Sequence, residues 1–469
     1  MRITPFGAAG GVTGSCYYIT TKKAKIVIDC GIFQGFSISE EQNRIPPSID
    51  IPGLSAVILT HAHLDHCGRL PLLVKAGYRG PIFALASAIE VAKLILLDAA
   101  HIQESDTIRA NRRRARALRK PREPLFTTED VKKVFPLFQA VEYEQETPAG
   151  TGFKFKFVDA GHLLGSSSVE LFVNDQGVQK SLLFSGDLGN YNSPIMRDPK
   201  TIDDHDFDMI FVESTYGDRD HRDLDATVRE FYELVSAAIK RNGKVLIPTF
   251  AVGRAQQLLF HLGQFFASGT LPRVPIYLDS PMAIKASRLY KNHVDEIDEQ
   301  LSVPATQQML KEGLKSLKVC ETGEESQALN DKPGPFIVLA GAGMCNGGRI
   351  LHHFRHGLCK SENTVIICGY QAEGSLGRML AEGKKRVRIF GEEIGVAATV
   401  RTLGGFSAHA GQTELMKWLT PLCQKSKEKR PRVVVIHGEN KQRAALAELI
   451  HVRFGIRPMI PYLGEAIIL

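Results

Sequence analysis

Four side chains that can bind metal ions lie close together in the segment THAHLDH. They are His61, His63, Asp65 and His66, and they directly follow an apolar run that predicts a strand. Imidazole and carboxylate groups are the ligands that zinc prefers where a water molecule must stay bound and reactive. His61, His63 and Asp65 alternate along the chain, whereas His66 directly follows Asp65 and can point to a different centre. The spacing therefore predicts two metal ions rather than one.

Four side chains cannot complete the coordination of two metal ions, so further ligands must come from elsewhere in the chain. Three candidates follow predicted strands: His162 in GHLLGS, Asp187 in SGDLG and His437 in IHGE. Taken singly, each is more often an ordinary loop residue, but together they supply the missing donors. Asp29 also ends a predicted strand, and we expect its carboxylate to orient a loop or a ligating histidine.

Short predicted strands position these residues in the first half of the chain. Apolar or alternating runs bounded by Gly, Asp and Asn predict strands at residues 26–28, 56–59, 153–158, 182–184 and 209–212. From about residue 215 the pattern changes, and predicted strands and helices alternate at 245–247, 254–266 (a helix), 274–278, 337–339 and 365–367. That alternation is typical of a parallel, doubly wound α/β sheet. Strands return at 387–403 and 433–436, which predicts one domain interrupted by another.

Length and composition are those of a globular protein with more than one core. The chain has 469 residues, of which 43% are hydrophobic and 23% charged, and two domains are expected at this length. Its formal net charge of +7 is compatible with a polyanionic partner. The eight cysteines form no C-x-x-C pair. No secretory signal or membrane-length apolar run is visible, so we expect a cytoplasmic protein with reduced thiols and no membrane partner.

A basic segment at residues 111–122, with the sequence NRRRARALRKPR, contains no acidic residue. It follows a predicted helix near residues 89–97. Such a run is as often a solvated helix face as a functional surface. The alternative is a positively charged flap near the site, and the sequence leaves both interpretations open.

The arrangement of these residues resembles that of a known family. The four motifs of the metallo-β-lactamase superfamily are matched by Asp29, His61-x-His63-x-Asp65-His66, His162 and Asp187. Motifs A, B and C of its β-CASP branch are matched by Glu213, His409 and His437. Further similarity covers the segments at 340–344, 347–349, 369–374 and 406–410. That branch includes the endonuclease of the cleavage and polyadenylation specificity factor, ribonuclease J and small prokaryotic homologues, and the resemblance covers essentially the whole chain.

The resemblance implies an α/β fold with two zinc ions per chain. Residues 1–213, completed by residues 400–469, would form an αββα sandwich, with a doubly wound β-CASP domain inserted at 214–399 and the substrate between the two. One zinc ion would be held by His61, His63, His162 and Asp187. The other would be held by Asp65, His66, His437 and the shared Asp187.

The resemblance also implies a ribonuclease that acts in RNA processing or decay. RNA-acting members carry histidine in motif C, whereas DNA-repair members carry valine, and this chain has His437. Two zinc ions ~3.5–4 Å apart can activate a hydroxide for in-line attack at phosphorus, leaving 5′-phosphate and 3′-hydroxyl ends; Asp65 and Asp187 belong to this machinery. The leaving oxygen needs a proton, for which His409 is the candidate general acid, oriented and kept charged by Glu213.

Glycine-rich loops after predicted strands can bind phosphate through backbone N–H groups. Contacts with RNA are expected from Gly341, Gly343, Arg349, Gln371, Arg378 and Ser407. The glycine-rich loop at residues 7–15 can be interpreted either as a phosphate-binding loop or as a plain turn.

Two rival functions use the same metal core. A DNA nuclease is disfavoured by His437, and a small-molecule ester or thioester hydrolase is disfavoured by the inserted domain and by His409. The balance between endonucleolytic and 5′-exonucleolytic cleavage stays open at this point, as does the formation of a homodimer.

Overall fold

The computed structural model describes residues 1–35, 40–203, 205–369, 371, 374–424 and 430–469. The chain divides into two compact units, each assembled from segments that are distant in the sequence. Unit 1 consists of Met1–Tyr191, Asp198–Asp220 and His409–Leu469. Unit 2 consists of Asn192–Arg197 and His221–Ala408. Both units are mixed α/β structures, and the chain of unit 1 is interrupted by unit 2.

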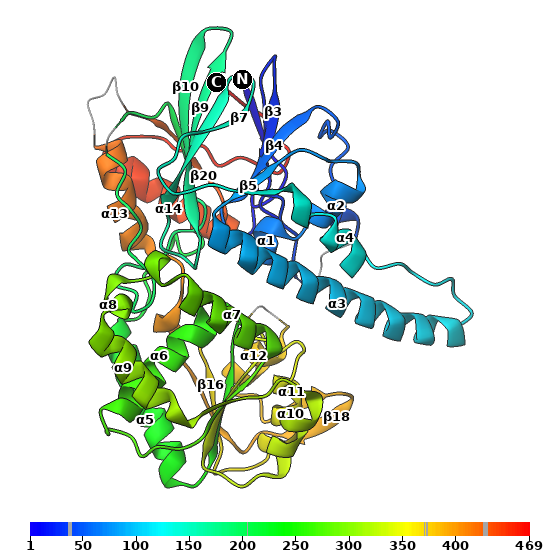
Figure 1. Ribbon diagram of the computed structural model, residues 1–469, viewed down its shortest axis with the longest axis vertical. Coiled ribbons are helices and arrows are strands. Elements are labelled where there is room, and N and C mark those ends of the chain that lie inside the picture. Colours follow the sequence, from blue (N-terminus) through cyan, green and yellow to red (C-terminus); the bar gives the residue numbers. More distant parts are fainter. Residues whose placement is uncertain (36–39, 204, 370, 372–373, 425–429) are drawn as a thin grey trace. The chain divides into compact units, whose positions relative to one another are not determined.

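Unit 1 contains two β-sheets (Figure 1). The seven-stranded sheet has the order β21-β1-β2-β3-β4-β5-β6. Its strands are β1 (Arg2–Pro5), β2 (Tyr17–Thr20), β3 (Lys25–Ile28), β4 (Leu54–Ile58), β5 (Ile82–Ala84), β6 (Phe138–Ala140) and β21 (Ile467–Ile468). The six-stranded sheet has the order β20-β11-β10-β9-β8-β7. Its strands are β7 (Thr147–Gly150), β8 (Phe153–Asp159), β9 (Ser167–Asp175), β10 (Val178–Phe184), β11 (Met209–Val212) and β20 (Arg432–Val435).

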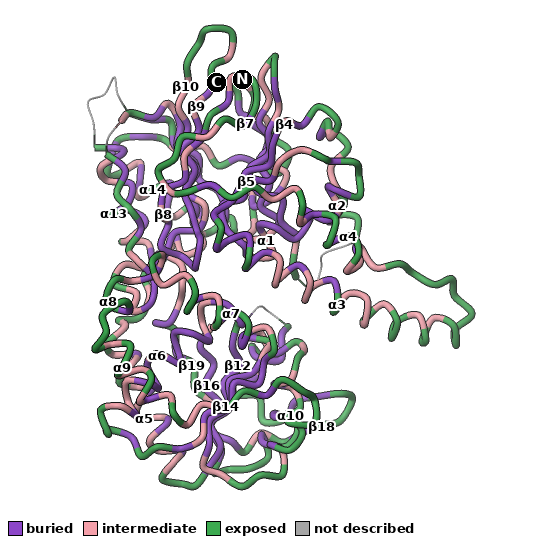
Figure 2. The backbone as a smooth tube through the Cα atoms, in the orientation of Figure 1, coloured by how far each residue is buried: buried purple, intermediate pink, exposed green. Residues whose placement is uncertain are grey.

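Aromatic side chains fill the space between these two sheets. The rings of Tyr17 in β2 and Phe184 in β10 have centroids 5.6 Å apart, and those of Phe83 in β5 and Phe155 in β8 are 5.4 Å apart. Because successive residues of a strand point to opposite faces, alternate apolar positions of each strand enter this layer. Figure 2 shows the strands of unit 1 as its most buried part.

Helices cover the outer faces of both sheets in unit 1. They are α1 (Leu64–Cys67), α2 (Leu70–Lys75), α3 (Ala86–Arg116), α4 (Thr128–Lys132), α13 (Gln412–Cys423) and α14 (Asn440–Phe454). A buried cluster joins Trp418 of α13 and Leu446 of α14 to Val433 of β20. The first four helices lie beside the seven-stranded sheet (Figure 1). The order of layers is therefore that of an αββα sandwich.

Unit 2 contains one six-stranded sheet in which all paired strands are parallel. Its order is β14-β13-β15-β12-β16-β19. The strands are β12 (Lys244–Pro248), β13 (Ile276–Asp279), β14 (Leu317–Val319), β15 (Phe336–Ala340), β16 (Thr364–Ile367) and β19 (Thr399–Thr402). A separate antiparallel ribbon is formed by β17 (Arg386–Ile389) and β18 (Glu392–Gly395).

Helices pack on both faces of the sheet in unit 2. The helices are α5 (Leu224–Lys240), α6 (Arg254–Ala267), α7 (Pro281–Asn292), α8 (Glu299–Ser302), α9 (Pro304–Gly313), α10 (Gly323–Asp331), α11 (Ile350–Gly357) and α12 (Leu376–Ala381). Val245 and Ile247 of β12 enter a buried cluster with α5, α6 and α7, whereas Leu246 enters a second cluster with α10, α11 and α12. Since neighbouring residues of a strand face opposite ways, the sheet is doubly wound.

The predicted elements agree with the observed ones to within a few residues at their ends; the predicted helix at 254–266, for example, is α6. The helix predicted near residues 89–97 is longer than expected, because α3 continues to Arg116 and includes the first half of the basic segment. Both interpretations of that segment, a solvated helix face and a charged flap, stay predictions. The domain boundaries predicted at 213 and 399 stay predictions. The compact units change at residues 220 and 408, and β19 pairs with β16 inside unit 2.

None of the described helices is both long enough and apolar enough to cross a membrane.

Candidate metal centre

Loops at strand ends in unit 1 carry all the predicted metal ligands. In chain order, the ligands follow β4 (His61, His63 and, within α1, Asp65 and His66), β8 (His162), β10 (Asp187) and β20 (His437). Strand β4 belongs to the seven-stranded sheet, and the other three strands belong to the six-stranded sheet. The site is therefore assembled from both sheets of the sandwich, and its side chains are buried or half-buried.

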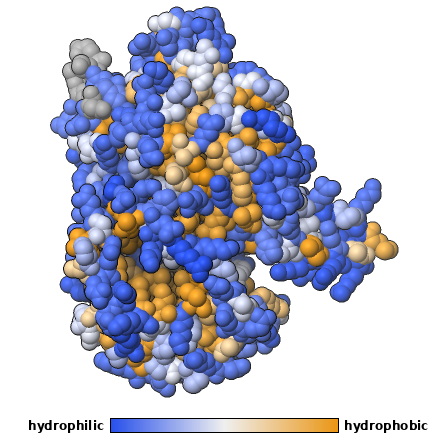
Figure 3. Space-filling view, in the orientation of Figure 1, coloured by the Kyte–Doolittle hydropathy of each residue, from blue (hydrophilic) through white to orange (hydrophobic). Residues whose placement is uncertain are grey.

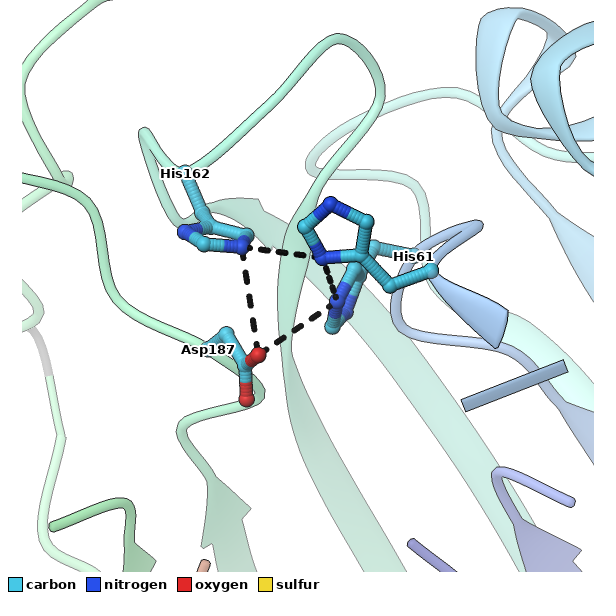
Figure 4. Close-up of side chains that lie close together, drawn as sticks. His61, His162 and Asp187 are labelled. Atoms are coloured by element: carbon cyan, nitrogen blue, oxygen red, sulfur yellow. Dashed lines mark hydrogen bonds and ion pairs between the residues drawn. The ribbon is translucent and has the colours of Figure 1, made fainter. Parts of the chain in front are cut away.

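The first ligand group brings three imidazole nitrogens and one carboxylate oxygen together; Figure 4 labels three of its four residues. His63 Nδ1 lies 3.2 Å from His61 Nε2 and 3.2 Å from His162 Nε2. Asp187 Oδ2 lies 3.5 Å from His61 Nε2 and 3.8 Å from His162 Nε2. A tetrahedral zinc ion with bonds of 2.0–2.1 Å needs ligand atoms about 3.3–3.4 Å apart. These separations suit a four-coordinate zinc ion.

The second ligand group lies on the other side of Asp187. His66 Nε2 is 3.1 Å from His437 Nε2. Asp65 Oδ2 lies 3.9 Å from His66 Nε2 and 3.7 Å from His437 Nε2. Asp187 Oδ1 is 3.3 Å from His66 Nε2 and 3.5 Å from His437 Nε2. The two oxygens of Asp187 therefore face different groups, as the oxygens of a bridging carboxylate do.

Two further observations show that these residues fit zinc. His63 Nδ1 approaches two imidazole nitrogens equally closely, although a single N–H can serve only one of them. Asp187 Oδ1 is buried and accepts no hydrogen bond from the described part of the chain, whereas buried polar atoms are normally paired. Lone pairs that converge on a cation account for both features. The imidazole and carboxylate donors are those that zinc prefers.

One buried carboxylate supports histidines of both groups. Asp29 Oδ2 is 2.7 Å from His66 Nδ1 and accepts a hydrogen bond from Thr60 Oγ1 at 2.9 Å. Thr60 Oγ1 in turn lies 3.1 Å from His61 Nδ1. Because the hydroxyl donates to Asp29, it is free to accept the Nδ1 proton of His61, so that Nε2 is the atom of each ring that is left for a metal. The role of Asp29 in orienting these histidines stays a prediction, which the contacts with His66 and Thr60 support.

His437, in the second ligand group, is held by Thr215 and by the backbone of Ala8. Its Nδ1 lies 3.2 Å from Thr215 Oγ1, and its backbone N–H donates to the carbonyl of Ala8 at 2.7 Å. Its backbone is in the left-handed region, with φ of 47°, as is that of Asp29 with φ of 58°. Residues other than glycine adopt this conformation infrequently, although aspartate and histidine do so more often than most.

The protonation of the histidines follows from burial and from neighbouring carboxylates. Burial lowers the pKa of His61 well below its usual value and lowers the pKa of His63 to about 4, so both rings are neutral at pH 7. Burial also acts on His66, but the charges of Asp187 and Asp29 raise the pKa of His66 well above its usual value. A metal ion must displace that proton, so binding at the second group releases protons and strengthens as pH rises.

His409 and Glu213 form a pair next to the metal ligands. His409 Nδ1 lies 3.3 Å from Glu213 Oε1, and the ring of His409 has its centroid 4.5 Å from that of His162. Glu213 is completely buried, and its two oxygens accept backbone N–H groups from Leu188 at 2.7 Å and Thr215 at 3.1 Å. These contacts fix the carboxylate, which in turn fixes the imidazole.

Charge keeps His409 protonated in this position. Burial lowers the pKa of His409, but Glu213, with smaller contributions from Asp187 and Asp65, raises it to about 9. The ring can therefore donate a proton at neutral pH. Asp187, Glu213 and His409 also lie close enough together to form a third metal-binding group. The zinc content of a His409→Ala variant distinguishes a proton donor from a ligand.

The predicted phosphate contacts belong to unit 2, whereas the metal ligands belong to unit 1. Gln371 Nε2 donates to the carbonyl of Gly343 at 2.9 Å, which ties two glycine-rich loops together. Arg349 donates to the buried Asp279 at 2.7 Å, and Arg378 donates to Glu382 at 2.7 Å. A phosphate-binding role for these residues, for Gly341 and for Ser407 stays a prediction. Residues 370, 372 and 373 of the same motif lie outside the described residues.

Sequence reasoning missed Thr60 and Thr215 as parts of the site. Each hydroxyl contacts the Nδ1 atom of a predicted ligand, His61 for Thr60 and His437 for Thr215. The available signal was position alone, because Thr60 precedes the ligand cluster and Thr215 follows Glu213 by two residues. Threonine is common at strand ends for many reasons, so position alone does not assign a role.

An αββα sandwich with zinc-type ligand groups at its strand ends, interrupted by a doubly wound unit, defines a metal-dependent hydrolase of two-unit architecture. Comparison with known families agrees. Residues 9–79 match the metallo-beta-lactamase superfamily, residues 255–380 match the Beta-Casp domain, and residues 393–461 match the Zn-dependent metallo-hydrolase RNA specificity domain.

Similar proteins extend over the whole chain. Ribonuclease TTHA0252 of Thermus thermophilus is 41% identical over 467 residues, which is 100% of both chains. The transcription termination factor FttA of Methanothermobacter thermautotrophicus is 29% identical over 98% of this chain and 70% of that protein. A crystal structure of a protein of unknown function from Enterococcus faecalis shares the fold, with a TM-score of 0.56, 14% identity and coverage of 100% and 99%. The chain belongs to the β-CASP branch of the metallo-β-lactamase superfamily.

Proposed function

We propose that this protein is a zinc-dependent ribonuclease that binds two zinc ions per chain and hydrolyses RNA to 5′-phosphate and 3′-hydroxyl ends. One observation carries the proposal: Asp187 presents its two oxygens to two ligand groups, beside the pair formed by His409 and Glu213. The zinc-dependent family supports the metal, and the name of the relative from Thermus thermophilus supports the substrate.

Bound zinc ions supply Lewis-acid charge that polarises the phosphodiester and lowers the pKa of the attacking water. The chain's own residues do the rest. Asp29 and Thr60 orient His61 and His66 through their Nδ1 atoms. His409 donates a proton to the leaving 3′ oxygen, which would otherwise depart as a poorly stabilised alkoxide. Glu213 keeps His409 charged and fixes the direction of its ring.

RNA is favoured over DNA or a small ester by features of this chain. His437 lies 3.1 Å from His66 as part of the second ligand group, where the resemblance associates histidine with RNA-acting members. Residues 393–461 match a family model described as an RNA specificity domain. A thioester, whose thiolate leaving group departs without a proton, needs neither this domain nor a proton donor.

All eight cysteines carry free thiols. Structural disulfides are typical of oxidising compartments, so we also propose a cytoplasmic location.

The test is cleavage of one RNA of about 30 nucleotides, labelled in turn at each end, by protein with and without a chelator. We expect cleavage that the chelator abolishes, that zinc restores, and that yields ends with a 5′-phosphate. DNA of the same sequence and a chromogenic carboxylic ester serve as competing substrates. His61→Ala should abolish cleavage, whereas the exposed His356→Ala should not, because His356 belongs to none of the ligand groups. Equal turnover of the DNA, or turnover of the ester alone, would contradict the proposal.

A further inference from the structure

The second half of α3 is a helix without a core. The helix spans 31 residues, and its buried side chains end at Ala100. No residue from 101 to 125 is buried, although the helix continues to Arg116, about 24 Å further along its axis. Figure 2 shows this end of α3 leaving the body of unit 1. Helices in proteins owe most of their stability to an apolar face that packs, so packing does not account for this extension.

Residues 101–122, here called the arm, carry a net charge almost as large as that of the whole chain. The arm contains eight basic residues and two acidic ones, so it contributes +6 to a formal net charge of +7. Seven of the eight basic residues are arginines. Arginine presents a planar fork of N–H donors that matches the geometry of a phosphate group, whereas lysine has no such fork.

Four of these arginines share one face of the helix. Arg109, Arg112, Arg113 and Arg116 follow one another at intervals that keep them within about 100° around the axis. Arg109 lies 3.6 Å from Asp106, whereas the other three are exposed and form no ion pair with an acid of the described chain. The charged face lies opposite the side on which Ala100 packs.

The remaining basic residues help to hold the end of the arm in shape. Arg114 donates to the carbonyl of Lys120 at 2.6 Å. Asn111 pairs with the backbone of Arg122 through two hydrogen bonds of 2.8 and 2.9 Å. The returning chain is thus fixed to the helix, so the charged face is preorganised rather than a loose tail.

The start of α3 connects the arm to the metal centre within unit 1. Gly165, in the loop of His162, packs so closely on Ala88 that an added Cβ would lie 2.5 Å from its backbone nitrogen. From Ala86 the helix axis extends about 35 Å to Arg109 and about 45 Å to Arg116. At about 3.4 Å per nucleotide of a stacked strand, this is a length of roughly 10–13 nucleotides.

We propose that the arm binds the phosphate backbone of RNA about 10 nucleotides or more from the cleaved bond. The inference rests on the proposed ribonuclease function. The contact is independent of sequence, and it anchors long RNA without taking part in the chemistry. Short RNA that fills only the metal centre does not reach the arm.

The test replaces Arg112, Arg113 and Arg116 by glutamine, which keeps the helix propensity. Cleavage of a 30-nucleotide RNA and of a tetranucleotide is measured between 0.05 and 0.5 M salt. Three lost contacts should reduce the slope of log KM against log salt by about 2 and raise KM for the long RNA roughly 100-fold at 0.1 M salt. For the tetranucleotide, KM and its salt dependence should stay at the wild-type values. Circular dichroism and zinc content should report an intact fold.

Two control variants separate local contact from net charge. Arg2, Lys22 and Lys23 are exposed residues of unit 1, and their replacement by glutamine removes the same three charges elsewhere. This variant should keep the wild-type slope. Replacement of the three arm arginines by lysine should keep most of the salt dependence, because the charges remain. Equal effects of the two glutamine triples, or an unchanged slope in the arm variant, would overturn the inference.

Failure of the proposed ribonuclease function can be told apart from failure of RNA binding by the arm, because the wild type would then cleave neither the long RNA nor the tetranucleotide.

An anionic membrane is the alternative partner of the arm, since the arm also exposes apolar residues, among them Leu118, which is 96% exposed. Figure 3 shows a mostly hydrophilic protrusion with a small apolar end. Sedimentation with vesicles of anionic phospholipid tests this partner. Binding to vesicles that the arm variant loses, with no change in KM for long RNA, would replace RNA by lipid as the partner.

Discussion

Removal of the Thr60 hydroxyl tests whether this side chain supports the metal site that contains His61. In Thr60→Val the shape of the side chain is kept, but Oγ1 is replaced by a methyl group. In the wild type Oγ1 lies 3.1 Å from His61 Nδ1 and donates to Asp29 at 2.9–3.0 Å, in a position that is only 1% exposed. The backbone N–H of Thr60 still donates to Asp29 at 2.8 Å in the variant, so the loop itself should keep its course.

The two ligand groups should respond differently. His61 loses its Nδ1 partner, and a buried donor without an acceptor costs about 1–3 kcal/mol, or roughly 5- to 150-fold in an equilibrium constant. Removal of such supporting partners commonly lowers metal affinity about 10- to 100-fold. His66 keeps its direct contact with Asp29 at 2.7 Å. We therefore expect zinc affinity to fall about 10- to 100-fold at the His61 group and much less at the His66 group.

Zinc binding is measured by competition with a chromophoric chelator, with total zinc by elemental analysis and urea unfolding of the zinc-free protein as a check on folding. The wild type should bind two zinc ions, and Thr60→Val should bind one tightly and one weakly. Thr60→Ser restores the hydroxyl and should restore the second tight site. Two tight sites in Thr60→Val, or equal damage in Thr60→Ser, would refute the role of the hydroxyl.

Three further predictions concern the metal ions and the proton donor. Protein purified without chelator should contain close to two zinc ions per chain by elemental analysis, and a value near one with full activity would contradict the two-zinc proposal. His409→Ala should keep its zinc and bind RNA but lose roughly 10²–10⁴ in kcat, and an activated substrate whose leaving group needs no proton should be cleaved almost normally; loss of zinc instead would make His409 a ligand. Glu213 raises the pKa of His409, so the acid form of His409 is present below this raised pKa and activity should fall as pH rises through it. Bound zinc weakens the influence of Asp187 and Asp65, which leaves Glu213 as the main cause of the raised pKa of His409. Glu213→Gln should therefore move the alkaline limb of the pH–rate profile to lower pH. If the limb does not move, a group other than His409 causes it.

The sequence alone predicted the mixed α/β class and the core of the metal site, for physical reasons. His61, His63, Asp65 and His66 lie within one loop, so their proximity is guaranteed by the covalent chain and needs no knowledge of the fold. Strands and helices were predictable because apolar residues recur with periods of about 2 and 3.6. His162, Asp187 and His437 were recognisable as residues at strand ends, but their assignment to particular ligand groups came from the family resemblance.

Tertiary structure alone decided which atoms meet. Asp187 lies between His162 and His437 because β10 lies between β8 and β20 in the sheet, and hydrophobic periodicity does not specify this order of strands. Thr60 reaches both Asp29 and His61 because the ends of β3 and β4 lie side by side in a parallel pair. The arm likewise emerges only from the structure, because its continuation past Ala100 depends on where unit 1 ends and solvent begins. A linear pattern states which residues prefer burial, but only the packed chain determines which partners each buried polar atom finds.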